Sequence, residues 1–189
     1  SLTALASRDI ETVIKNDNGV KTLTCPNPDC PAKKIKSFEN FVSRNCMNID
    51  RISEETLEKF IGHGFLKDFD DIFRLDRYKN EIISMPGFGE LSYNNIISAV
   101  ETARKTTCAR LLNALGIANV GRANAIMICR HFDNDFMKVM NAAKEELLEI
   151  DGVGDVIAEE IFKYFNDEAN RQLVEKLLKE VTFEEEQRG

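Results

Sequence analysis

The sequence predicts a mainly α-helical protein, built from repeated helical units that follow a small β-hairpin. Apolar residues recur at helical spacing along almost all of the chain from residue 37 onward. Short segments with a glycine or a serine at one fixed place interrupt this pattern. The aligned residues are Ser53, Gly89, Gly121 and Gly154, which are 36, 32 and 33 residues apart. A near-constant period in this range is typical of repeated helix–turn–helix units, so we expect four of them.

The interrupting segments are predicted to be tight turns. Met85–Gly89 reads Met-Pro-Gly-Phe-Gly, Ile150–Gly154 reads Ile-Asp-Gly-Val-Gly, and Leu115–Gly121 is a weaker version. Glycine allows a positive φ and a close approach of the backbone, so such a turn leaves the first N–H groups of the next helix pointing outward. Because the N-terminus of a helix favours a bound phosphate, these turns are candidate phosphate sites. The alternative is that each turn only lets two helices pack.

Composition is ordinary for a globular protein that folds without disulfides. The chain has 189 residues, of which 43% are hydrophobic and 30% charged. No apolar run is long enough to cross a bilayer, and Ser1–Ile10 lacks the basic-then-apolar order of a signal peptide. The odd number of cysteines, five, favours a reducing compartment. We therefore expect a cytoplasmic protein in which Cys46, Cys108 and Cys129 are buried packing residues.

The net charge of −7 is unevenly distributed. Residues 133–189 contain 16 acidic and 7 basic residues, a net −9, which leaves +2 for residues 1–132. The first part of the chain can therefore accommodate a phosphate-bearing partner, although the overall charge does not favour one. The basic residues of this part gather at Lys33, Lys34, Lys36, Arg44 and Arg51, and then at Arg104, Lys105, Arg110 and Arg122.

The first 36 residues have a different pattern. β-branched residues in Thr12–Lys15 and Val20–Thr24, on either side of the polar segment Asn16–Gly19, predict a β-hairpin. Cys25 and Cys30 follow on a proline-rich loop with four residues between them, and supply half of the ligands of a structural zinc site. The alternative is a metal-free remnant of a zinc ribbon.

The sequence thus divides into a β-hairpin and partial zinc-finger region over residues 1–36, a helical domain over 37–183, and an acidic tail or linker over 184–189. Within the second repeat, Phe69–Leu75 and Arg77–Ser84 are expected to form the short first helix. Pro86 cannot continue that helix and ends it.

Five segments identify a family by their order. They are Cys-Pro-Asn-Pro-Asp-Cys-Pro-Ala at 25–32, Phe-Val-Ser-Arg-Asn-Cys-Met-Asn-Ile at 41–49, Gly-Phe-Gly at 87–89, Ala-Arg-Leu-Leu-Asn-Ala-Leu-Gly-Ile at 109–117, and Asp-Gly-Val-Gly at 151–154. Together they closely resemble the bacterial NAD-dependent DNA ligases, over about residues 20–181. The resemblance implies the end of a four-cysteine zinc finger, with Cys25 and Cys30 as ligands, and a helix-hairpin-helix domain of four motifs.

The same resemblance implies sequence-independent binding of nicked double-stranded DNA through backbone phosphates, as the non-catalytic part of a ligase that seals nicks in replication and repair. No catalytic residue is expected here, since the family's adenylation and OB domains lie upstream and its BRCT domain lies downstream. NAD and Mg are expected to serve the parent enzyme and not to bind this segment. The expected DNA-binding residues are Gly87, Gly89, Gly121, Arg122, Gly152, Gly154, Arg104, Lys105 and Arg110.

Two features depart from the family pattern. The first pair of zinc cysteines would stand near Ser7–Ile10, where this sequence has none. The first hairpin has Arg51-Ile52-Ser53 where the family usually carries glycines, so we expect it to pack and not to bind phosphate. A monomer in the bacterial cytoplasm, with no membrane partner, is the expected state.

Two other functions fit part of the sequence. An interaction or scaffold module, with little DNA affinity of its own, is favoured by the −9 charge of residues 133–189. A subunit of an excision nuclease or a recombination complex fits the repeats but does not explain the segment 25–32.

Overall fold

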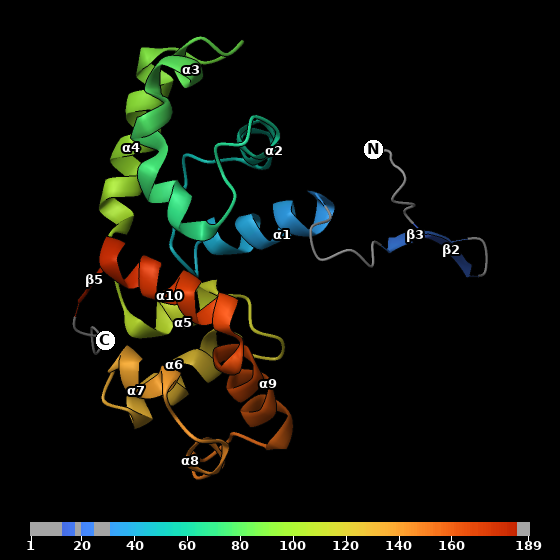
Figure 1. Ribbon diagram of the computed structural model, residues 1–189, viewed down its shortest axis with the longest axis vertical. Coiled ribbons are helices and arrows are strands. Elements are labelled where there is room, and N and C mark those ends of the chain that lie inside the picture. Colours follow the sequence, from blue (N-terminus) through green and yellow to red (C-terminus); the bar gives the residue numbers. More distant parts are fainter. Residues whose placement is uncertain (1–12, 18–19, 25–30, 185–189) are drawn as a thin grey trace. The chain divides into compact units, whose positions relative to one another are not determined.

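The computed structural model describes residues 13–17, 20–24 and 31–184. The chain divides into two compact units, residues 1–37 and residues 38–189, and each is described here by itself (Figure 1). In the described part of the chain, no helix is both long enough and apolar enough to cross a membrane.

The first unit contains the expected β-hairpin. Strands β2 (Val13–Asp17) and β3 (Val20–Thr24) are antiparallel, with Val13 opposite Thr24. The predicted turn began at residue 16, which is wrong because Asn16 and Asp17 pair with Lys21 and Val20. The first strand therefore extends two residues further than predicted. The two cysteines at 25 and 30 lie outside the described residues.

The second unit is helical, which confirms the mainly α-helical part of the predicted fold class. Residues 31–37 of helix α1 (Pro31–Val42) belong to the first unit, and the rest of this helix belongs to the second. Its helices are α2 (Glu54–Gly62), η1 (Phe69–Tyr78), α3 (Lys79–Ile83), α4 (Glu90–Ala103), α5 (Cys108–Ala114), α6 (Arg122–His131), α7 (Phe136–Met140), α8 (Lys144–Leu148), α9 (Asp155–Asn166) and α10 (Glu168–Glu180). Helix α10 packs against both α9 and η1, so the last helix of the unit contacts its sequence neighbour and an element much earlier in the chain.

The segment before α4 differs from the predicted α-helix. Residues 69–78 form the 3-10 helix η1, interrupted at Arg74, whose φ of −122° is not helical, and α3 has only five residues. The Asp71 carboxylate accepts hydrogen bonds from the backbone N–H groups of Lys67 and Asp68 at 2.9 and 3.0 Å, which fixes the start of η1. The Asp70 carboxylate is almost fully buried beside Arg74, and burial raises the pKa of this carboxyl.

A short parallel pair of strands was not predicted. Strand β4 (Lys105–Thr106) pairs with β5 (Thr182–Phe183), where the N–H of Thr182 donates to the carbonyl of Arg104 at 2.7 Å. The N–H of Glu184 donates to the carbonyl of Thr106 at the same distance, so the chain is still bound to the domain at residue 184, where the predicted tail begins. Two-residue strands are too short to show the alternation that identifies a strand in a sequence.

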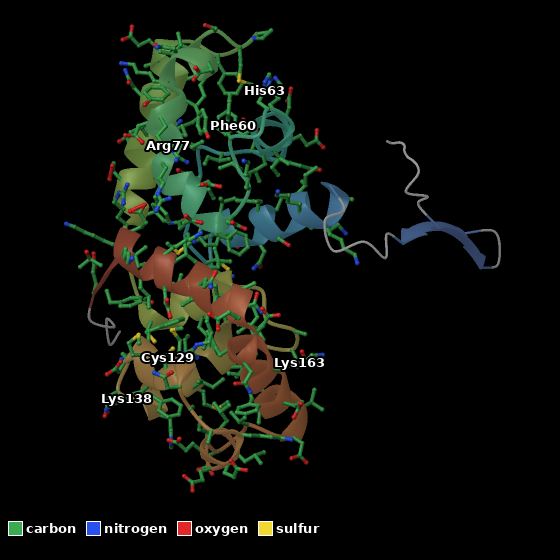
Figure 2. The ribbon with its side chains drawn as sticks, viewed as in Figure 1. Phe60, His63, Arg77, Cys129, Lys138 and Lys163 are labelled. Carbon is green, nitrogen blue, oxygen red and sulfur yellow. The ribbon has the colours of Figure 1, made fainter. Side chains whose placement is uncertain are left out.

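The core of the second unit contains several aromatic contacts among its aliphatic side chains. The rings of Phe41 and Phe69 stack with centroids 4.4 Å apart, and Phe38 meets Phe69 edge-on at 5.1 Å. Cys129 on α6, labelled in Figure 2, and Cys108 on α5 are both buried. Their sulfur atoms are 2.9 Å apart. Cys46 is buried as well, which confirms the prediction for all three cysteines.

Candidate nucleic-acid interface

The four aligned residues occupy the same structural position. Ser53, Gly89, Gly121 and Gly154 are the N-cap residues of α2, α4, α6 and α9. Each of these helices therefore begins one residue after the aligned position. The repeat period seen in the sequence is thus a repeat of helix starts.

The turns before α4, α6 and α9 share one geometry. The third residue of each turn has a positive φ: 84° at Gly87, 66° at Asn119 and 91° at Gly152. In each turn the N–H of the fourth residue donates to the carbonyl of the first at 3.0 Å, from Phe88 to Met85, from Val120 to Ile117 and from Val153 to Ile150. A positive φ at the third residue with this hydrogen bond is typical of a type II β-turn. Asparagine tolerates this conformation, which explains why the third turn needs no glycine at 119.

The N-cap glycines are not required by the backbone. Their φ values are −154° at Gly89, −95° at Gly121 and −91° at Gly154, all in the extended region that any residue adopts. A Cβ added at any of the three would meet no atom within 4 Å. Serine or aspartate would cap these helices better than glycine does. Glycine at these places instead keeps the helix N-termini uncovered, which is what a ligand of the backbone N–H groups needs.

The first aligned segment is different. The Ser53 hydroxyl accepts a hydrogen bond from the N–H of Thr56 at 3.2 Å, so a side chain of the protein itself already caps α2. Arg51, which stands at the place of Gly87, Asn119 and Gly152, is not among the positive-φ residues of the described ranges. This geometry agrees with the expectation that the first hairpin packs.

Three of the four cationic residues selected from the sequence lie together. Lys105, Arg110 and Arg122 line a groove of about 410 Å³ beside the start of α6. Its other polar lining residues are Asn45, Thr106, Thr107, Asn134 and Glu184. Arg110 is held in place because its guanidinium donates to the carbonyls of Arg44 and Cys46 at 2.9 and 3.1 Å. Lys105 and Arg122 are exposed.

Arg104 does not join this groove. Its guanidinium donates to the carbonyl of Phe73 at 2.8 Å and to the carbonyl of Glu180 at 3.0 Å, and lies over the Phe73 ring. It also pairs with the carboxylates of Glu101 and Glu180. These contacts tie α4, η1 and α10 together, so the geometry favours a structural role for this residue.

A second groove contains two cations, Arg51 and Lys59, that were not among the expected DNA-binding residues. It has a volume of about 400 Å³ and lies between α2 and the turn before α4, with Arg51, Lys59 and Gly87 in its lining. The Lys59 ammonium lies 3.4 Å from the Glu55 carboxylate and 5.4 Å from the centre of the Phe88 ring. The four-residue spacing of Glu55 and Lys59 on a helix predicts that the two side chains pair. Their position beside the turn before α4 appears only in the structure.

The described ranges contain no group of three or more histidine, cysteine, aspartate or glutamate residues that could hold a metal. His63 stacks on Phe65 at 5.4 Å between ring centroids, and His131 meets Phe132 edge-on at 5.0 Å. Both histidines are exposed, and each contacts the ring of a neighbouring phenylalanine. Cys25 and Cys30 lie outside the described part of the chain.

Comparison with known proteins identifies the architecture. The model of the helix-hairpin-helix motif family matches residues 110–174, which include the turns before α6 and α9. A DNA ligase of Ruminiclostridium cellulolyticum is 49% identical over 94% of this chain, and one of Lachnoclostridium phytofermentans is 51% identical over the same share. A DNA ligase of Petrotoga mobilis is 38% identical over 82% of the chain. The chain spans 27% of the length of the first two relatives and 23% of the third. These matches identify the chain as a homologue of one region of the DNA ligases.

Proposed function

We propose that this chain binds the phosphate backbone of duplex DNA without reading the bases, as the DNA-gripping part of an NAD-dependent DNA ligase. The observation that carries the proposal is the set of three equivalent turns, each followed by a helix whose N-terminus is kept uncovered by glycine. The four aligned segments then count as four helix-hairpin-helix motifs, of which the first packs and the other three bind.

At each binding hairpin, backbone N–H groups at the helix start donate to a phosphate oxygen. The helix dipole adds about 0.3–1 kcal/mol at an exposed site. Gly89, Gly121 and Gly154 leave the helix starts uncovered, and Gly87 and Gly152 provide the positive φ of the turns before them. Lys105, Arg110 and Arg122 neutralise further phosphate charge. The α3–α4 and α8–α9 turns lie at opposite ends of the second unit (Figure 1). Contacts so far apart suit an extended duplex better than a single phosphate group, and carry no base information.

The remaining ligase chemistry belongs to other parts of the parent protein in this proposal. Self-adenylation from NAD, with Mg, transfer of AMP to a 5′-phosphate and nick sealing would take place in adenylation and OB domains upstream. A BRCT domain would follow downstream. The parent enzyme would act as a monomer in replication and repair in the bacterial cytoplasm. This segment holds the duplex during that reaction.

Binding should be measured by fluorescence anisotropy with nicked and intact duplexes of one sequence, from low to moderate salt. We expect both to bind, with little dependence on sequence. Each neutralised phosphate lowers the slope of log K against log salt by about 0.9, so three groove cations predict a slope near about −3. Absence of binding at low salt would contradict the proposal and favour a scaffold role, to which the −9 charge of residues 133–189 points.

We also propose a structural zinc ion bound by Cys25 and Cys30. Two cysteines with four residues between them on a proline-rich loop support it, and two further thiolate or imidazole ligands are needed. The full-length parent protein should contain one zinc per chain by elemental analysis, and a Cys25→Ser variant should lose it. Equal zinc content in the variant and the unaltered protein would contradict the assignment.

A further inference from the structure

Two exposed aliphatic side chains occupy one repeated position. Leu91 is 75% exposed and Val156 is 62% exposed, and each is the second residue after the N-cap glycine of its helix. The large hydrophobic residues exposed on the described part of the chain are Leu91, Met137, Leu148 and Val156. Two of these four residues therefore lie at helix starts that are proposed phosphate sites.

Single exposed apolar residues on a surface need no explanation, but a matched pair at one place in a repeat does. Neither side chain belongs to the core or packs against it. Charged residues stand next to both, Glu90 before Leu91 and Asp155 before Val156, so these helix starts are not apolar in general. The other two repeats have Glu55 and Ala123 at this place.

We propose that Leu91 and Val156 contact the deoxyribose of the DNA strand whose phosphate is held at the same helix start. This inference rests on the proposed function. Between consecutive phosphates, the part of a strand that faces a bound protein is the sugar, which presents C–H groups. A side chain two residues beyond the N-cap lies in the first turn of the helix, beside the phosphate seat. Burying an aliphatic group against the sugar is favourable and does not depend on sequence.

The contact of Leu91 and Val156 with deoxyribose would therefore contribute to DNA binding without neutralising phosphate charge. The second and fourth hairpins, before α4 and α9, would hold the strand by N–H donors and by an aliphatic contact. The third hairpin, before α6, has Ala123 at this place and would rely on the cationic groove, which is the groove lined by Lys105, Arg110 and Arg122. This division separates the two kinds of contact by their dependence on salt, because only charge neutralisation releases counterions.

The test replaces both residues by polar ones of similar size, Leu91→Asn and Val156→Thr. Anisotropy titrations with a nicked duplex at several salt concentrations should show affinity lower by about threefold for each variant and about tenfold for the double variant. The slope of log K against log salt should not change, since no charge is altered. Circular dichroism and thermal melting should show an intact fold, because both side chains are exposed.

Met137→Gln is the matched control. Met137 is 49% exposed on α7, a helix that follows none of the aligned turns, so its replacement should leave DNA affinity unchanged. A double variant that binds like the unaltered protein, while Gly121→Asp weakens binding, would overturn the inference and leave the proposed function standing. If sedimentation shows that the double variant loses self-association while DNA affinity stays the same, the pair binds a second copy and the inference is wrong. No binding by the unaltered chain would remove the proposed function itself.

Discussion

Gly121→Asp is expected to weaken the binding of duplex DNA by about tenfold or more while the fold becomes no less stable. A charge-assisted hydrogen bond contributes about 1.5–3 kcal/mol, and the new carboxylate both takes up the N–H donors at the start of α6 and repels phosphate. The backbone at Gly121 is extended and a Cβ there meets no atom within 4 Å. Aspartate is also a better N-cap than glycine, by a few tenths of a kcal/mol. Anisotropy and urea unfolding measure the two effects.

Ser53→Asp provides the control for this variant. It introduces the same carboxylate at the aligned position of the first hairpin, where the Ser53 hydroxyl already caps α2. We expect DNA affinity to stay within about twofold, since the Ser53 side chain already occupies the N–H of Thr56 at this helix start. Equal losses from both substitutions would mean that the carboxylates act only through net charge. Unchanged binding by Gly121→Asp would remove the third hairpin from the interface.

Arg104→Met is expected to destabilise the second unit by about 2 kcal/mol without changing the dependence of DNA binding on salt. Methionine keeps an apolar stem over Phe73, but the carbonyls of Phe73 and Glu180 lose their charged donor. The Glu180 carboxylate also loses one of its cations. Urea unfolding measures the loss of stability, and anisotropy titrations measure the salt slope.

Lys105→Met, at the next residue, should have the opposite pattern. Lys105 is exposed and lines the cationic groove, so its removal should leave the free energy of unfolding unchanged. The slope of log K against log salt should become shallower by about 0.9, the contribution of one phosphate contact. A shallower slope for Arg104→Met at intact stability would show that Arg104 contacts DNA after all.

The sequence alone determined four of the helix starts and the turns that precede them. Periodicity placed Ser53, Gly89, Gly121 and Gly154, and all four are N-cap residues. This worked because a turn is local: a few adjacent residues set its φ values and its hydrogen bonds. The β-hairpin was found for the same reason, with an error of two residues at the turn. The absence of glycine from the first segment likewise predicted its different geometry.

Only the tertiary structure decided what the charged residues do. Arg104 and Lys105 are adjacent in sequence and equally basic, yet one is bound to carbonyls 31 and 76 residues away while the other is exposed in a groove. The pairing of β4 with β5 joins segments about as far apart. Neither a long side chain nor a two-residue strand has a local sequence pattern that identifies its partner. Its partner depends on which distant segments the core brings together, and that is fixed when the apolar faces of the helices pack.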